Sequence, residues 1–223
     1  MKGEVVVVDN GSTYASIRVA MESGASVVVE SNRGYGSACR RGLHEARGRY
    51  LVLGDADGTY DFGMLGQFVH PLRNEADVVL GNRLTQNLEP GVMPWHHRRI
   101  GNPFLTHVMN RLFAVGVSDA HCGLRSISRE AYSTMNVGAA GMEFASEFLI
   151  EATRNSLRIV EVPIRYRQRS GGDPKLRAFR DGWRHLSLMV TKSRKSMPDE
   201  SQRYRWAGLD RNGIVDQGAK ESV

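Results

Sequence analysis

The sequence predicts an α/β fold, with an open, mostly parallel sheet and helices on both of its faces. Short β-branched runs alternate with segments of helical periodicity through the first 80 or so residues, which is typical of parallel strands joined by crossover helices. The centres of these runs are continuously apolar, as expected for strands covered on both faces. A length of 223 residues with 41% hydrophobic content is enough for one domain with a sizeable core.

Each expected strand is a short apolar run that ends at residues typical of turns. These strands cover residues 4–9, 26–30, 50–55, 77–82 and 157–166. Several segments between and after them carry apolar residues at spacings of three and four, which is the helical period. The expected helices cover residues 14–23, 36–47, 62–72, 102–113 and 142–155. Residues 118–128 form a polar stretch for which no element is predicted.

The chain divides into one expected domain and a tail. We expect the folded domain over residues 1–190 and a polar, disordered tail over residues 191–223. Cys39 and Cys122 show neither a disulfide framework nor zinc-ligand spacing, which favours a reducing, cytoplasmic compartment. No apolar run approaches the ~20 residues that span a bilayer.

The formal net charge of +6 is concentrated toward the C-terminus, since 14 Lys and Arg stand against 5 Asp and Glu between Arg154 and Arg205. Such a region can bind nucleic acid, anionic lipid or a phosphorylated substrate. The sequence has no recognisable nucleic-acid-binding module and no aromatic residues interleaved with the basic ones. We therefore expect no nucleic acid partner.

Polar residues follow three of the predicted strands at their carboxyl ends, where open α/β sheets bind ligands. Any one of these groups alone is more simply a turn or a helix N-cap. Three groups at one edge of a sheet favour a ligand site instead. The candidates are Asp9, Asn10 and Ser12 after the first strand, Glu30 and Gly34 after the second, and Asp55 and Asp57 after the third.

The pair Asp55 and Asp57 is the strongest chemical signal among these candidates. Two carboxylates one residue apart repel each other, and a hard cation such as Mg2+ or Mn2+ relieves the repulsion while keeping coordination positions for phosphate oxygens. The pair therefore predicts a metal-bridged diphosphate.

The glycine pattern argues against two other classes of phosphate-binding protein. The glycines of residues 33–37 resemble part of a dinucleotide fingerprint, but Cys39 occupies the position of its third glycine and the preceding strand is the second one. No Gly-Lys-Ser/Thr phosphate loop is present either.

Several motifs together resemble a known family. VVDNGST at 7–13, NRGYG at 32–36 and GDADGTYD at 54–61 resemble the nucleotide-sugar half of inverting family 2 glycosyltransferases, which have the GT-A fold. DVVLGNR at 77–83, HCGLR at 121–125, GMEF at 141–144 and EVPI at 161–164 resemble the polyprenyl-phosphate branch, which includes dolichyl-phosphate mannose and glucose synthases. The resemblance covers residues 4–190.

The resemblance implies transfer of a hexose from a nucleotide sugar, UDP-glucose ahead of GDP-mannose, to a polyprenyl phosphate. The phosphate oxygen of such an acceptor is ionised at neutral pH, so it can attack the anomeric carbon without a side-chain base. Asp55 and Asp57 would hold Mg2+ or Mn2+ and stabilise the leaving nucleoside diphosphate.

The resemblance also implies roles for other candidates. Arg83 and Arg125 align with positions that bind the acceptor phosphate, for which guanidinium forks are well shaped; the alternative for each is a surface ion pair. Arg169 and Lys175 lie where the family has a basic loop that closes on the phosphates. Asp9 and Glu30 would lie near the base and ribose, on the same donor side as the candidates Asn10, Ser12 and Gly34.

One departure from the family affects the expected activity. Family members usually begin with one more strand and helix, so we expect residues 5–8 to lose a neighbour in the sheet. This departure makes a non-catalytic nucleotide-sugar or lipid-phosphate binding remnant the alternative function. A nucleotidyltransferase is a weaker third hypothesis, because the sequence has no glycine-rich, lysine-bearing entry loop.

Residues 175–190 offer a route to the membrane. Apolar residues recur there at spacings of three and four while arginines occupy other faces, which is the pattern of an interfacial helix near anionic lipid. The alternative is a helix packed on the core with a solvated basic face. We expect peripheral contact with the cytoplasmic face of the membrane.

Overall fold

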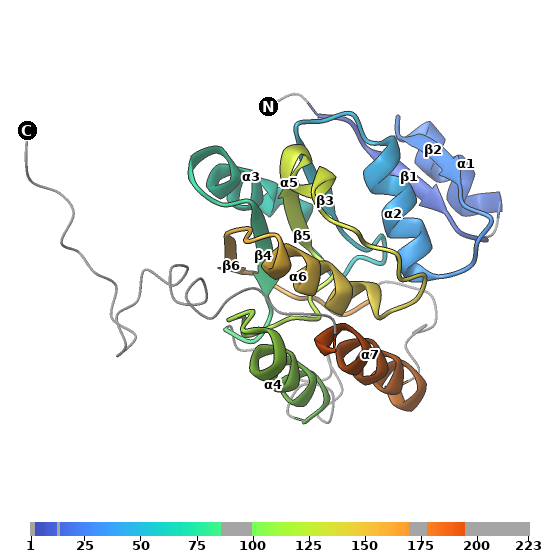
Figure 1. Ribbon diagram of the computed structural model, residues 1–223. Coiled ribbons are helices and arrows are strands. Elements are labelled where there is room, and N and C mark those ends of the chain that lie inside the picture. The colour runs from blue at the N-terminus through green and yellow to red at the C-terminus, as the bar shows by residue number, and fades with distance from the viewer. Residues whose placement is uncertain (1–2, 13, 86–99, 170–177, 195–223) are drawn as a thin grey trace, which may run out of the picture.

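The computed structural model describes residues 3–12, 14–85, 100–169 and 178–194. Its strands form two sheets (Figure 1). In the first, β1 (Val6–Asp9) pairs in parallel with β2 (Ser26–Val29). The second has four strands in the order β3 (Tyr50–Leu53), β5 (Arg125–Ser128), β4 (Val78–Asn82) and β6 (Ile159–Pro163).

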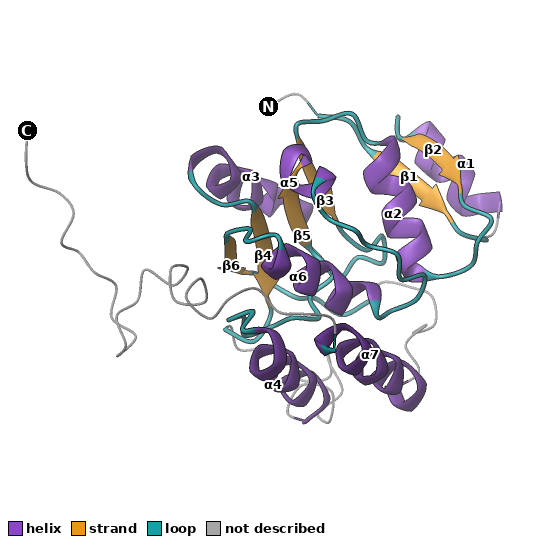
Figure 2. Ribbon diagram, viewed as in Figure 1, coloured by secondary structure: helices purple, strands orange, loops and turns teal. Residues whose placement is uncertain are grey.

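Helices surround both sheets (Figure 2). They are α1 (Tyr14–Glu22), α2 (Tyr35–Glu45), α3 (Leu65–Asn74), α4 (Asn102–Phe113), α5 (Arg129–Ser133), α6 (Phe144–Arg154) and α7 (Ala178–Ser193), with a 3-10 turn at Phe62–Met64 before α3. The predicted α/β class is confirmed. Helix α7 reaches Ser193, and the predicted boundary between domain and tail at residue 190 stays a prediction.

Strand β5 corrects the prediction for residues 118–128, since their last four residues form a strand that is antiparallel to both β3 and β4. The sequence hid this strand because Ser126 and Ser128 flank its apolar Ile127. The fold accommodates the polar side chains: the Ser126 hydroxyl donates to the Phe68 carbonyl oxygen at 3.1 Å, and Ser128 caps α5. One antiparallel strand thus interrupts the otherwise parallel set.

The core lies around β4, whose five residues are all buried. Phe68 of α3, together with Phe144 and Phe148 of α6, is fully buried in the same cluster. Burying side chains of this size stabilises a fold by about 1.5–3 kcal/mol each. The four-stranded sheet is therefore the rigid part of the molecule from which the strand-end loops extend.

The β1–β2 sheet shares no strand pairing with the four-stranded sheet. Among the described strands, β1 pairs only with β2, and β3 pairs only with β5. Helix α2 contacts both β1 and β3 and so connects the two sheets. Val6, Val7 and Val8 are only half-buried, which fits the expectation that residues 5–8 lie at an edge.

None of the helices in the described ranges combines the length and the apolar character that crossing a bilayer requires.

Helix α7 is attached to α6 through a buried polar contact and a row of ion pairs. The Ser146 hydroxyl of α6 lies 2.7 Å from His185 Nδ1 of α7 and 3.3 Å from His121 Nε2. The two imidazole rings meet edge to face at 4.7 Å. The ion pairs are Lys192 with Glu147 and Glu151, at 3.0 and 2.7 Å, and Arg184 with Glu143, at 2.8 Å.

The histidine contact makes stability depend on pH. Burial lowers the pKa of His185 from 6.5 to about 4, and it also lowers the pKa of His121. Below about pH 6.5 the unfolded chain binds protons at these imidazoles that the native protein does not bind. The free energy of unfolding should therefore fall as the pH falls from 6.5 toward 4.

Urea unfolding at pH 7 and pH 5 tests this prediction. His185→Gln should lose less stability between the two pH values than the wild type, whereas His107→Gln, a change at an exposed position of α4, should behave as the wild type does. An equal loss in His185→Gln and the wild type would contradict the prediction.

Candidate active site

Asp57 is held firmly at the carboxyl end of β3. Its Oδ1 accepts hydrogen bonds from the Thr59 amide at 3.0 Å and from the Thr59 hydroxyl at 2.5 Å. Its Oδ2 pairs with Nη2 of Arg169 at 2.9 Å. Both carboxylate oxygens are thus in use, and the side chain has one defined orientation.

The carboxyl group of Asp55 is affected by its burial. Burial raises its pKa above the ordinary value, and the neighbouring Asp57 charge raises it further. Arg125, Arg169 and Arg83, in that order, act in the opposite direction. The structure therefore brings together the two predicted metal ligands and three of the predicted phosphate-binding cations.

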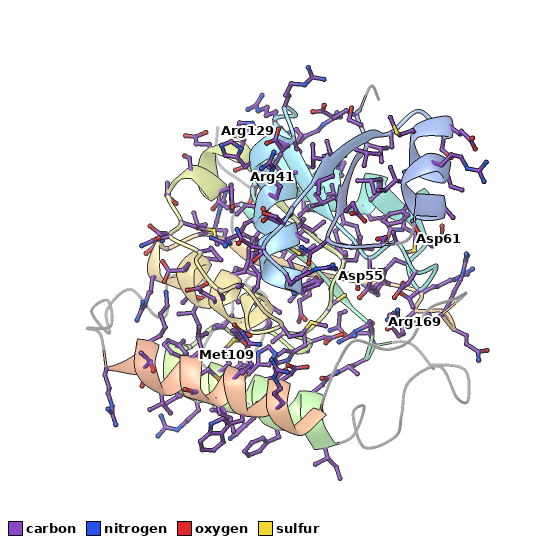
Figure 3. All side chains as sticks on the ribbon, turned by 90° about the vertical axis from the view of Figure 1, so that its right-hand side faces the viewer. Arg41, Asp55, Asp61, Met109, Arg129 and Arg169 are labelled. Atoms are coloured by element: carbon purple, nitrogen blue, oxygen red, sulfur yellow. The ribbon has the colours of Figure 1, made fainter. Side chains whose placement is uncertain are left out.

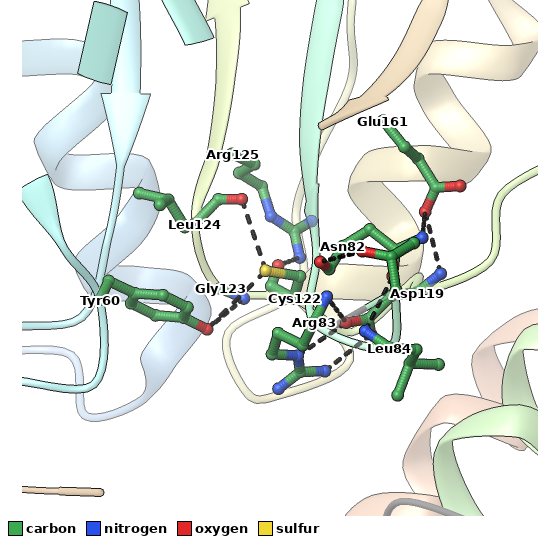
Figure 4. Close-up of polar contacts among 11 residues, drawn as sticks. Tyr60, Asn82, Arg83, Leu84, Asp119, Cys122, Gly123, Leu124, Arg125 and Glu161 are labelled. Carbon is green, nitrogen blue, oxygen red and sulfur yellow. Dashed lines mark hydrogen bonds and ion pairs between the residues drawn. The ribbon is translucent and has the colours of Figure 1, made fainter. Parts of the chain in front are cut away.

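Gly123 allows the segment before β5 to approach this pair. A Cβ atom at Gly123 would lie 2.6 Å from Asp55 Oδ2 and 3.0 Å from the Tyr60 hydroxyl oxygen. The Tyr60 hydroxyl accepts a hydrogen bond from the Gly123 amide at 2.8 Å (Figure 4). A larger residue at this position would therefore displace the Asp55 carboxylate.

Arg83 follows β4 and forms a buried, bidentate ion pair (Figure 4). Its Nε and Nη2 each lie 2.7 Å from a carboxylate oxygen of Asp119, whose Oδ2 also accepts from the Arg83 amide at 3.0 Å. Glu161 of β6 orients Asp119 in turn by accepting from its amide at 3.0 Å. The Arg83 guanidinium lies 5.3 Å from the Tyr166 ring centre.

Arg125 is a buried cation, only 1% exposed. Its Nη1 donates to the Ala145 carbonyl at 3.2 Å, its Nη2 donates to the Cys122 carbonyl, and its guanidinium lies 5.3 Å from the Phe148 ring centre. Its Nε has no hydrogen-bond partner in the structure. Because Arg83 and Arg125 are both buried, the alternative of surface ion pairs is wrong for both.

Arg169 belongs to a short segment, residues 165–169, which we call the strap. The strap follows β6 and runs antiparallel to the chain after Asp57, with a bridge between Tyr60 and Tyr166. The Arg167 amide donates to the Thr59 carbonyl at 2.9 Å, and the Arg167 guanidinium pairs with Asp61 at 2.7 Å. Figure 3 labels Asp55, Asp61 and Arg169 in this region.

The candidates after β1 and β2 make hydrogen bonds within and between the two loops that follow these strands. The Asn10 amide nitrogen donates to the Glu30 carbonyl at 2.7 Å and the Asn32 carbonyl at 2.9 Å, and its oxygen accepts from the Gly34 amide at 2.8 Å. The Glu30 carboxylate accepts from the Asn32 amide at 2.7 Å. Asn10 thus joins the two loops.

Asp9 has local contacts, whereas Gly34 lies close to a distant segment of the chain. The Ser12 side chain and amide, with the Gly11 amide, lower the pKa of Asp9 by hydrogen bonding. Gly34 has a φ of 143°, and a Cβ there would lie 2.2 Å from the Ala140 carbonyl oxygen. Lys175 lies outside the described residues.

The donor set near Asp55 and Asp57 fits a hard divalent cation in part. Carboxylate oxygens are the ligands such ions prefer. Within the described ranges no group of three or more His, Cys, Asp or Glu residues could hold a metal. A metal held by this pair would therefore need further ligands beyond the His, Cys, Asp and Glu side chains of the described ranges.

The sequence did not predict three residues that hold the site in place, namely Asp119, Glu161 and Tyr60. Asp119 lay in the polar stretch without a predicted element, and Glu161 was a lone acid in an apolar strand. A charged residue inside an otherwise apolar strand is the one sequence signal that indicates a polar partner for Glu161.

The proteins that this chain resembles in sequence are glycosyltransferases. The model of glycosyl transferase family 2 matches residues 2–135. The low-salt glycan biosynthesis hexosyltransferase Agl6 of Haloferax volcanii is 44% identical over 192 residues, which cover 86% of this chain and 46% of that protein. The dolichyl-phosphate hexose transferase of the same organism is 32% identical over 185 residues, which cover 81% of this chain and 77% of that protein.

The chain spans about half the length of Agl6. Among solved structures, glucosyl-3-phosphoglycerate synthase from Mycobacterium tuberculosis, in complex with Mn2+, UDP and glucosyl-3-phosphoglycerate, matches with a TM-score of 0.64 at 22% identity. The match covers 88% of this chain and 70% of that one. It shows a GT-A-like fold, as the sequence predicted.

The close approach at Gly123 predicts a specific loss of stability. Gly123→Ala should lower the free energy of unfolding by about 1–3 kcal/mol, because the added methyl group would overlap the Asp55 carboxylate and the Tyr60 hydroxyl. Urea unfolding measures the change. Gly138→Ala is the matched control, since nothing lies within 4 Å of a Cβ there. Equal stabilities of the two variants would contradict the packing described for Gly123.

Proposed function

Because this chain belongs to glycosyltransferase family 2, we propose that it transfers a hexose from a nucleotide sugar to a polyprenyl phosphate, with inversion at the anomeric carbon and with Mg2+ or Mn2+ at Asp55 and Asp57. The observation that carries the proposal is the grouping of this carboxylate pair with Arg83, Arg125 and Arg169. Two acids among three cations suit a metal diphosphate next to a second phosphate group.

The donor side of the proposal rests on the acids. Asp57 has a fixed orientation through Thr59, and Asp55 lies beside it against Gly123. A metal bound there would neutralise charge on the departing nucleoside diphosphate. The similar synthase from M. tuberculosis was solved with Mn2+ and UDP-glucose, which supports a divalent metal and favours UDP-glucose over GDP-mannose as the donor.

The acceptor side rests on the buried arginines. Asp119 and Glu161 hold Arg83 in one orientation, and Arg125 is fixed by two backbone carbonyls. Their positive charge attracts an acceptor phosphate toward the carboxylate pair and offsets the charge of both reactants. The acceptor oxygen needs no side-chain base, since it is ionised at neutral pH. The name of the dolichyl-phosphate hexose transferase supports a polyprenyl phosphate.

Binding without transfer is the second candidate function. It is favoured by the loops after β1 and β2, where Asp9, Asn10 and Glu30 use their side chains for contacts within and between these two loops. In that case the carboxylate pair would bind a nucleotide sugar or a lipid phosphate that does not react.

An exposed surface of α4 and α7 supports peripheral membrane contact, which we place at the cytoplasmic face. The two helices lie side by side (Figure 1), and Trp183 is 73% exposed. We use the name α4–α7 face for the exposed apolar and basic residues of these two helices, which are Phe104, Trp183, Val190, Arg111 and Arg180. Aromatic and basic side chains together are typical of surfaces that bind anionic lipid.

A transfer assay tests the proposed reaction. With Mn2+, labelled UDP-glucose and a short polyprenyl phosphate, the wild type should move label into the organic phase. Asp57→Asn should lower the rate at least 100-fold, because one of two proposed metal ligands loses its charge. Asp61→Asn, in the same loop and paired with Arg167, should keep most of the activity. Metal-dependent UDP-glucose binding with no transfer by the wild type would instead identify the binding function.

The α4–α7 face predicts binding to vesicles. Trp183→Ser should weaken binding to phosphatidylserine-containing vesicles about 10-fold in a flotation assay, because a large aromatic side chain no longer enters the interface. Val19→Ser, a change of an exposed apolar residue of α1, should have no effect. Equal binding by all three proteins, or no binding by the wild type, would contradict membrane contact through this face.

A further inference from the structure

The ion pair between Arg169 and Asp57 lies on one of the two carboxylates that would hold the metal. We propose that Arg169 occupies Asp57 in the metal-free protein, so that the metal and the donor diphosphate bind together and either alone binds poorly. This inference rests on the proposed function, because it concerns the order in which that site is filled.

Asp57 has little capacity left for another cation. Its Oδ1 is used by two hydrogen bonds from Thr59, and its Oδ2 by Arg169 at 2.9 Å. A carboxylate accepts about four hydrogen bonds in all. A metal ion arriving alone must therefore displace the guanidinium from Oδ2, or share the oxygen with a like charge.

The electrostatic surroundings add to this cost. Arg83 and Arg125 also act on the neighbouring carboxyl group of Asp55, so a divalent cation that approaches the carboxylate pair meets the positive charge of two more arginines besides Arg169. Within the described part of the chain no group of three or more His, Cys, Asp or Glu side chains could hold a metal. Mg2+ and Mn2+ prefer about six oxygen ligands, so the carboxylate pair alone leaves most coordination positions to other ligands.

The donor diphosphate removes both obstacles. Its oxygens supply metal ligands and compensate the arginine charges, and a guanidinium released from Asp57 has phosphate oxygens to pair with. Each ligand thereby makes the site more favourable for the other. By linkage, the factor by which the diphosphate tightens metal binding equals the factor by which the metal tightens diphosphate binding.

The strap is held by contacts that do not involve Arg169, so the ion pair between Arg169 and Asp57 can break without releasing it. Arg167 pairs with Asp61 at 2.7 Å, and the bridge between Tyr60 and Tyr166 holds the strap against the Asp57 loop. Arg169 extends beyond this tether and is more exposed at its side chain than Asp57, 37% against 13%. It can thus leave Asp57 while the strap stays in place.

Mn2+ binding, measured by electron paramagnetic resonance with and without UDP, tests the inference. In the wild type, UDP should tighten Mn2+ binding strongly. Arg169→Gln should tighten Mn2+ binding in the absence of UDP about 5–10-fold and reduce the effect of UDP by a similar factor. Arg169→Lys should stay closer to the wild type, because the positive charge remains. Arg167→Gln removes a similar pair two residues away and should leave Mn2+ affinity unchanged.

The outcomes separate the inference from the proposed function. Unchanged or weaker Mn2+ binding by Arg169→Gln in the absence of UDP overturns the inference, while transfer activity in the wild type still supports the function. An equal gain in Arg167→Gln also overturns it, because general loosening of the strap would then explain the effect. No Mn2+ binding by any of the proteins, even with UDP, overturns both the inference and the proposed metal site. Thermal unfolding of each variant verifies that it is folded.

Discussion

Asp55 and Asp57 place two negative charges one residue apart at the end of a strand in the core sheet, and the rest of the site compensates for this repulsion. Burial raises the pKa of Asp55, and Arg83, Arg125 and Arg169 oppose that shift. Because charges of like sign are costly in a low-dielectric environment, the fold balances them with cations from three separate segments. The negative charge of the carboxylate pair is thus already compensated in part by the protein before any metal binds.

The cations are themselves kept in place by a second layer of contacts. Asp119 fixes Arg83 through both side-chain nitrogens that face it, and Glu161 fixes Asp119 through its amide. Removing one member of such a buried pair leaves the other without compensation. Strand β6, which carries Glu161, also leads into the strap, so one strand supports both Arg83 and Arg169.

The sequence predicted what depends on local patterns. Apolar runs predicted every strand but β5 in the described part of the chain, and the spacing of Asp55 and Asp57 identified the carboxylate pair. Strand β5 was missed because the buried contact of Ser126 with the Phe68 carbonyl, 58 residues away in the chain, is a tertiary effect. The ion pairs of Arg83 with Asp119 and of Asp57 with Arg169 likewise join distant segments, and no local pattern encodes them.

The incomplete pairing of β1 and β3 has a consequence for how the molecule opens. With one strand partner for β1 and half-buried valines along it, the unit of β1, α1 and β2 has less cohesion than the sheet around β4. Such units open as cooperative foldons below the global unfolding free energy. Amide protons of Val7 and Val28 should then exchange sooner than that of Val79, and a ligand that bridges Asn10 and Asp55 would slow them by suppressing this opening.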